Sequence, residues 1–264
     1  MVMKTIFYIP NVGQFGNKLY PTLLAALICI QNNSKMNVVN NPLIKFKHSF
    51  LNDYVTDDKI EHHNTRIKIT KPIKTDNEHL VLPRGYYQNY ELFLLYINLL
   101  KLQVVDLPVL TKNTKDIVLH LRLDGFNHAG HDSHILHPDF YLNILRRESF
   151  DKVYIVMATK SGRIWKKQQL HKERYLSYFS EFNYEIISND EYTDFEFIRS
   201  FDKIICSNST FAWWSAFFSE ASVVYIPEFF EGKHAKLNKM TNSVSCTQSY
   251  VNIETMETVP ITFS

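Results

Sequence analysis

One short segment of the chain contains side chains suited to holding a phosphate group. Within 207–210 a predicted strand ends and a predicted helix begins. Hydroxyl groups and backbone N–H groups therefore lie close together at the start of that helix. Helix starts of this kind attract anions because the N–H groups and the helix dipole point at the ligand. The same residues would serve equally well as a helix cap. The residues concerned are Ser207, Asn208, Ser209 and Thr210.

A second such segment ends the strand predicted over 117–123. Alternation along this strand places His120 and Arg122 on one face, opposite Leu119, Leu121 and Leu123. An arginine there can hold a phosphate through two parallel hydrogen bonds, and a surface arginine at a strand end is the competing interpretation. Together the two segments predict a diphosphate site in which a cation and backbone dipoles replace a metal ion.

The sequence GQFGN (13–17) follows the first predicted strand and is the third candidate segment. Gly13 and Gly16 would let the backbone approach a ligand closely, and Asn17 would lie at the start of a predicted helix. The spacing is not that of a dinucleotide-binding turn, and the acidic residue expected about 20 positions later is missing. A tight turn capped by Asn17 explains the segment as well as a ligand does.

Histidines recur at every third position in NHAGHDSHILH (127–137), and zinc would accept such ligands. This spacing faces one side only in a helical segment, which Gly130 and Pro138 oppose. We therefore expect an exposed loop that lines a cleft and holds no metal.

Strands and helices alternate along most of the chain, which predicts an α/β fold with parallel sheets and ligands at the carboxyl ends of the strands. The pattern restarts near residue 106, which indicates a second domain. The expected strands lie at 4–10, 36–40, 66–73, 117–123, 153–158, 185–188, 203–208 and 222–227, and the expected helices at 17–31, 87–102, 161–178, 192–200 and 210–220, with one more beginning at Pro138.

Composition narrows the class of protein. A net charge of +2 over 264 residues does not suit a general nucleic-acid binder. The longest apolar run, 91–100, is about half of a membrane span. The three cysteines, Cys29, Cys206 and Cys246, are far apart and lie in or beside apolar runs, so we expect reduced thiols. With no signal-peptide pattern at the start, a cytoplasmic protein is expected.

Four segments, in this order, resemble the alpha-1,2-fucosyltransferase family and its relatives among the protein O-fucosyltransferases and nodulation fucosyltransferases. This resemblance implies a GT-B-like α/β fold, with two Rossmann-like parallel-sheet domains facing a cleft. It implies an N-terminal acceptor-side domain over 1–110 and a C-terminal nucleotide-sugar-binding domain over 111–264. The segments are GQFGNKLYPTLLAA (13–26), GYYQNYELF (85–93), HLRLDGF (120–126) and DFEFIRSFDKIICSNSTFAWWSAFF (194–218).

The resemblance also implies roles for individual residues. Arg122 matches the first arginine of the family's H-x-R-R-x-D motif, which holds the donor β-phosphate, and His120 matches its histidine. Ser209 and Thr210 match a block at the diphosphate, and Asn17 matches an asparagine near the reacting sugar. Two positions depart from the pattern. Leu123 stands in place of the second arginine, and Asp124-Gly125 stands where Gly-Asp is usual.

The reaction implied by the resemblance is a metal-independent, inverting transfer of L-fucose from GDP-fucose to a glycan hydroxyl, with no cofactor. Asp124 and His120 are the nearest candidates for the general base, and Asp53 is a more distant one. Two alternatives stay open. One is the same fold with another GDP- or UDP-sugar, which Leu123 motivates, and the other is a non-catalytic glycan- or nucleotide-binding protein. The expected partners are a nucleotide sugar and a glycan, with peripheral contact to a lipid-linked acceptor allowed, and a bacterial or viral origin is favoured.

Overall fold

The computed structural model divides the chain into two compact units, Met1–Val109 and Leu110–Ser264. Their predicted roles in acceptor and donor binding, and the predicted cleft between them, remain predictions. The structure describes residues 5–8, 15–32, 35–38, 44–47, 53–54, 79–82, 93, 96–123, 135–158, 166–227, 247–251 and 258–260.

The first unit contains a four-stranded parallel sheet in the order β4-β2-β1-β5. Its first strand is central and leads towards a long helix, as the predicted strand–turn–helix opening requires. A separate antiparallel pair joins β3 to β6. The described elements are β1 (Thr5–Tyr8), α1 (Phe15–Asn32), β2 (Lys35–Val38), β3 (Lys45–Phe46), β4 (Asp53–Tyr54), β5 (His79–Leu82), α3 (Ile97–Leu99), the π-helical segment η2 (Leu100–Val104) and β6 (Val105–Asp106).

Helix α1 is apolar on nearly every side, and a helix of this kind must be buried. Its residues from Leu19 to Cys29 are all buried. The helix begins at Phe15, two residues before the predicted start, which changes two expectations. Asn17 is the third helical residue rather than the cap, and Pro21 lies in the second turn rather than the first. Pro21 has no N–H and so cannot donate to the carbonyl of Asn17 four positions earlier.

The rest of the first unit agrees with the sequence only in part. The strand predicted at 36–40 is β2, which begins and ends slightly earlier. The helix predicted over 87–102 corresponds to α3 and η2, which end at Val104. Much of that segment and all of the strand predicted at 66–73 lie outside the described residues.

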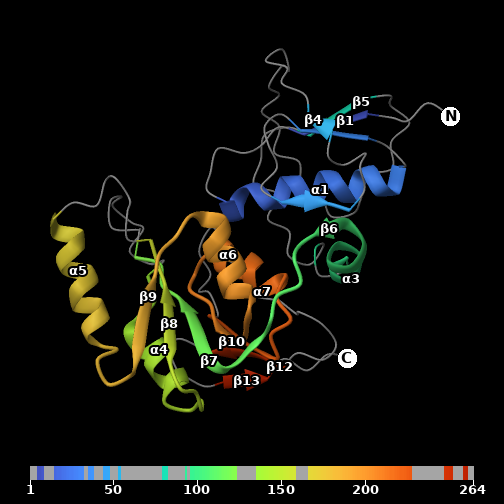
Figure 1. Ribbon diagram of the computed structural model, residues 1–264. Helices are drawn as coiled ribbons and strands as arrows, with labels where there is room; N and C mark the ends of the chain where they lie inside the picture. Colours follow the sequence, from blue (N-terminus) through green and yellow to red (C-terminus); the bar gives the residue numbers. More distant parts are fainter. Residues whose placement is uncertain are drawn as a thin grey trace. The chain divides into compact units, whose positions relative to one another are not determined.

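The second unit contains a seven-stranded sheet in the order β13-β12-β11-β10-β7-β8-β9 (Figure 1). All neighbouring strands pair in parallel except β12 with β13, so the predicted α/β fold with parallel sheets is confirmed. The elements are β7 (Asn113–His120), α4 (Pro138–Leu145), β8 (Val153–Val156), α5 (Lys166–Ser177), β9 (Tyr184–Ile187), α6 (Glu191–Arg199), β10 (Phe201–Ile205), α7 (Thr210–Phe217), β11 (Val223–Pro227), β12 (Thr247–Val251) and β13 (Thr258–Pro260).

The strand order reverses direction once, between β7 and β10. From β7 the chain adds β8 and β9 on one side, then returns to place β10, β11 and β12 on the other. This is the order of doubly wound dinucleotide-binding sheets, in which the ligand lies outside the carboxyl ends of the strands at the reversal. The carboxyl ends of β7 and β10 are therefore where the fold itself predicts a ligand.

Helices cover both faces of this sheet. On one face, α4 and the end of α5 pack against alternate residues of β7 and β8, among them Ile117, Leu119 and Ile155. On the other, α6 and α7 pack together through the rings of Phe195 and Phe218, whose centroids are 6.4 Å apart. Two-sided burial explains why the strands read as continuous apolar runs rather than as clean alternation.

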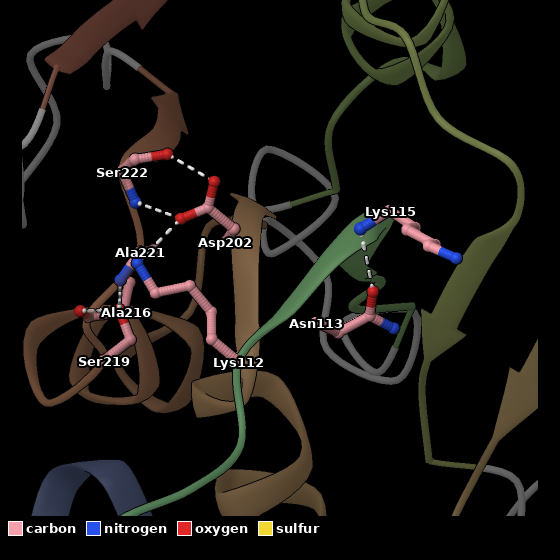
Figure 2. Close-up of polar contacts among 8 residues, drawn as sticks. All are labelled: Lys112, Asn113, Lys115, Asp202, Ala216, Ser219, Ala221 and Ser222. Atoms are coloured by element: carbon pink, nitrogen blue, oxygen red, sulfur yellow. Dashed lines mark hydrogen bonds and ion pairs between the residues drawn. The ribbon is translucent and has the colours of Figure 1, made fainter.

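A polar cluster joins three strands at the opposite, amino-terminal edge of the sheet (Figure 2). The carboxylate of Asp202 at the start of β10 accepts from the backbone N–H of Ser222 at 3.0 Å and from its hydroxyl at 2.6 Å. Lys112, just before β7, donates to the same carboxylate at 2.9 Å. The cluster ties β7, β10 and β11 together away from the predicted ligand edge.

Strands β12 and β13 were not predicted from the sequence, and Thr247–Val251 extends the parallel sheet beside β11. In the part of the chain that the structure describes, no helix combines the length and the apolar character needed to cross a membrane.

Candidate functional site at the carboxyl ends of β7 and β10

The predicted phosphate-binding segments of the second unit lie together at the point where the strand order reverses. Leu119 on β7 pairs with Ile205 on β10, so the residues that follow each strand leave the sheet side by side. His120 ends β7, and its Nδ1 lies 2.6 Å from the hydroxyl oxygen of Ser207. Two segments 87 positions apart in sequence therefore meet through side chains at this edge.

Arg122 makes the second link between the two segments. Its Nη1 donates to the backbone carbonyl of Asn208 at 3.3 Å, and its side chain is half-buried. Strand β7 ends at His120 rather than at residue 123 as predicted, so Arg122 lies two residues beyond the strand. The contact with Asn208 positions the guanidinium beside the start of α7, where an anion would meet both.

The start of α7 is capped as the sequence predicted. Ser209 is the cap residue, and its hydroxyl accepts from the backbone N–H of Phe211 at 3.2 Å. Its own N–H donates to the carbonyl of Ser207 at 2.8 Å, which closes a tight turn. Thr210 is the first helical residue and is partly exposed. Capping and anion binding use the same end of a helix, so the cap does not exclude a ligand.

The predicted alternation around His120 and Arg122 is confirmed. Leu119 and Leu121 are buried in the core cluster with α4, and Leu123 packs partly buried against it. His120 and Arg122 are half-buried and lie outside that cluster. Leu123 thus occupies the apolar side of the chain, opposite to Arg122.

Two aromatic residues that sequence reasoning missed hold His120 in place. The phenol of Tyr141 on α4 donates to the backbone carbonyl of His120 at 3.4 Å. The ring of Phe211 on α7 lies 5.3 Å from the imidazole, centroid to centroid. Burial raises the pKa of Tyr141, so its hydroxyl stays a donor over the whole physiological range. No local pattern marks either residue, because each contact depends on how a helix packs on the sheet.

The remaining predicted site residues are not among the described residues at this edge of the sheet. Gly16 and Asn17 lie in the first turn of α1 in the first unit, and their predicted place near the donor sugar stays a prediction. Gly13 and Asp124 lie outside the described residues. Asp53 lies on β4 of the first unit. Their roles rest on the sequence alone.

Among the described residues, no three His, Cys, Asp or Glu side chains are grouped so as to hold a metal ion. Of the repeated histidines, His137 is described, and it caps α4 by accepting from the backbone N–H of Asp139 at 3.3 Å. The other three lie outside the described part of the chain. For these three histidines, the absence of a metal therefore remains a prediction from the sequence.

The described cysteines are buried and form no disulfide with each other. Burial raises the pKa of the Cys29 thiol to about 12 and raises that of Cys206 as well. Both are therefore neutral thiols at physiological pH and poor nucleophiles. Cys206 follows β10 within the candidate site, yet its sulfur faces the carbonyl of Ala212 at 3.5 Å.

Comparison with known proteins assigns no family to this chain. No family model matches it, and no curated protein does. Among solved structures, it is similar to a crystal structure of POFUT1 in complex with GDP, with 11% identity and a TM-score of 0.42, over 83% of this chain and 96% of that one.

Proposed function

We propose that the protein is a glycosyltransferase that moves a sugar from a nucleoside diphosphate to a glycan hydroxyl, with GDP-fucose as the favoured donor. In this proposal the second unit binds the donor, and transfer is metal-independent and inverts the anomeric carbon. The donor sugar and the inverting course come from the resemblance of the four sequence segments. The support for a diphosphate site comes from the geometry of the second unit.

One observation carries the proposal. Arg122 and the start of α7 converge at the reversal of strand order, where Nη1 reaches the Asn208 carbonyl at 3.3 Å. A guanidinium supplies several N–H donors in a fixed plane, which is the geometry that holds a phosphate through parallel hydrogen bonds. The partly positive start of an eight-residue helix lies beside it. These are the two elements that a diphosphate needs in the absence of a metal.

The proposed chemistry assigns these groups to the leaving diphosphate. The acceptor hydroxyl attacks the anomeric carbon, the bond to the diphosphate oxygen breaks, and negative charge grows on that oxygen. Arg122 and the dipole of α7 stabilise this charge more in the transition state than in the bound donor, which is what lowers the barrier. The proton of the acceptor hydroxyl passes to a base, for which Asp124 and His120 are the nearest sequence candidates.

Leu123 favours a second candidate within the same class of enzyme. Because its side chain packs against the core cluster, this position contributes no cation on the ligand side. The alternative to GDP-fucose is therefore another GDP- or UDP-sugar, which differs from the donor of the resembled family in its base or its sugar. The last alternative is a non-catalytic protein that binds the nucleotide sugar or the glycan without transferring the sugar.

Thermal unfolding with a panel of nucleotides separates these candidates. A ligand present at 100 times its Kd stabilises a protein by about 2.7 kcal/mol, which raises the Tm of a domain this size by roughly 5–10 °C. We expect GDP and GDP-fucose to produce this shift in the wild type and not in Arg122→Ala. Preferential stabilisation by UDP-sugars would displace fucose. Stabilisation without any product in mass spectra from a glycan panel would support the non-catalytic alternative.

A further inference from the structure

The peptide bond between His120 and Leu121, just before Arg122, is held at both of its polar groups. Its N–H belongs to Leu121 and donates to the carbonyl of Val156, at the end of β8, at 2.8 Å. Its carbonyl belongs to His120 and accepts from the phenol of Tyr141 on α4 at 3.4 Å. A peptide group whose donor and acceptor are both bonded is held in one orientation, which sets the direction in which the chain leaves β7.

Tyr141 makes this contact from inside the core and not from the ligand side. It is 1% exposed, and its ring packs edge-on against Phe140 and Phe179, with centroids 5.0 and 6.1 Å away. A buried phenol needs an acceptor for its proton, and the carbonyl of His120 supplies one. Because the side chain is buried, its influence on the site passes through the backbone that it holds.

The two contacts lie where strand pairing stops orienting the chain. Leu119 is the last residue of β7 that pairs with β10, and His120 follows directly. On either side of Arg122, the neighbouring leucines pack against the core cluster with α4. Arg122 therefore extends from a segment whose orientation depends on packing and on the two hydrogen bonds of the preceding peptide.

The position of the guanidinium is sensitive to this orientation. Nη1 of Arg122 lies 3.3 Å from the carbonyl of Asn208, at the long end of hydrogen-bond distances. The guanidinium is also at the tip of a long side chain, so a small rotation of the backbone displaces it by more than the backbone moves. Loosening of the peptide before Leu121 should therefore separate the guanidinium from the start of α7.

We propose that Tyr141 is a positioning residue for the anion site, which rests on the proposed function for its ligand. From the opposite face of the sheet, its hydroxyl fixes the peptide between His120 and Leu121 and thereby directs Arg122 towards the start of α7. Part of the cost of ordering Arg122 is then met during folding and not on binding. A tyrosine that only filled the core would contribute to stability and leave anion affinity unchanged.

Calorimetric titration with GDP and with inorganic pyrophosphate tests this role. Tyr141→Phe removes the hydroxyl and keeps the ring, and we expect both ligands to bind about three- to tenfold more weakly, the effect of one hydrogen bond. Tyr175→Phe is the matched control, because this phenol lies in the same core cluster and also donates to a backbone carbonyl, that of Leu136. Both variants should lower Tm by a few degrees. Only Tyr141→Phe should lose affinity.

Hydrogen exchange and NMR relaxation test the same role without a ligand. In Tyr141→Phe the amide of Leu121 should exchange about three- to tenfold faster, because its peptide group has lost one anchor. The amide of Ile117, which donates to the carbonyl of Lys152 at 3.1 Å earlier in the same strand, is the internal reference and should change less. The Nε–H group of Arg122 should also become more mobile, whereas Tyr175→Phe should leave both signals as in the wild type.

The outcomes separate this proposal from the proposed function. Unchanged affinity in Tyr141→Phe, an equal loss in Tyr175→Phe, or an unchanged exchange rate at Leu121 would overturn the positioning role. Failure of the wild type to bind either GDP or pyrophosphate would instead overturn the proposed function. The exchange rates and the mobility of Arg122 in the ligand-free protein would then still decide whether Tyr141 orients this side chain.

Discussion

Arg122 and Asn208 are 86 positions apart in the chain, and the guanidinium of one donates to the backbone carbonyl of the other at 3.3 Å. The contact spans the point where the order of strands in the sheet reverses. It holds a long, flexible side chain near the start of α7 without neutralising its charge, because a carbonyl carries only a partial charge. Much of the entropy that would be lost on binding an anion is therefore lost already during folding.

Replacing Arg122 by alanine should abolish transfer while the protein stays folded. Removal of one preorganised donor to a developing charge lowers kcat by about 100- to 1,000-fold in well-studied enzymes. Because Arg122 is half-buried and lies outside the apolar core cluster, its loss should lower Tm by only a few degrees. Product formation and thermal unfolding measure the two effects. Lys115→Ala, at the exposed amino-terminal part of β7, is the control. Near wild-type turnover in Arg122→Ala would refute the role.

Substitutions of Ser209 should separate helix capping from anion binding. Ser209→Ala removes the cap of α7 and should cost about 1 kcal/mol of unfolding free energy. Ser209→Asp keeps a good cap and favours the helix dipole, so stability should be retained. The added negative charge should nevertheless weaken GDP binding by at least about tenfold. Urea unfolding and calorimetry measure these quantities, and undiminished GDP binding by Ser209→Asp would show that the helix start is not the diphosphate site.

Restoring the family's arginine at position 123 should not improve nucleotide binding. The side chain at this position packs against the core cluster and away from Arg122. Leu123→Arg should therefore lower the unfolding free energy by about 1–3 kcal/mol through loss of packing and burial of charge. We expect no gain in GDP affinity by calorimetry. Leu123→Met keeps the volume and is the control, and tighter GDP binding by Leu123→Arg would contradict the assignment of the two faces.

The Asp202 cluster predicts a pH dependence of stability. Burial by itself raises the pKa of Asp202. Hydrogen bonds from Ser222 and Lys112 lower this pKa by more than burial raises it, so it lies below the ordinary value of 3.8. A carboxylate with a lowered pKa stabilises the fold above its unfolded-state pKa, and this contribution is lost as pH falls through the folded-state value. Asp202→Asn should thus cost about 1–3 kcal/mol at pH 7 and much less near pH 3.

Urea unfolding at the two pH values measures that difference. Asp151→Asn, at an exposed position between α4 and β8, serves as the control and should change the unfolding free energy by less than about 0.5 kcal/mol. An equal cost of Asp202→Asn at pH 7 and pH 3 would mean that the charge of this carboxylate does not stabilise the fold.

Much of the second unit could be predicted because its local signals agree with one another. Apolar runs such as 153–156 end at turns, and helix starts carry capping residues such as Asp190 and Ser209. Alternation around Arg122 was sufficient to separate the predicted ligand side of this segment from its core side. Parallel pairing then brings the carboxyl ends of strands to one edge, so the two phosphate segments could be expected to meet.

Other features depend on tertiary packing and have no local signal. Tyr141 and Phe211 contact His120 only because α4 and α7 lie on opposite faces of the sheet. The start of α1 at Phe15 overrides the preference of Asn17 for a cap position, since burial of the apolar helix outweighs one capping hydrogen bond. A match to the motif does not predict the orientation of the side chain at position 123, because the motif gives residue types and not the face on which each side chain lies.

The reversal of strand order means that the proposed anion site is built from two separate parts of the chain. A backbone opened anywhere between β8 and β10 would leave His120 and Arg122 on one fragment and Ser207 and Asn208 on the other. Neither fragment alone would contain all the residues of the proposed diphosphate site. Recovery of GDP binding on mixing would therefore report reassembly of the whole sheet, which makes the nucleotide a probe for complementation between split halves of the unit.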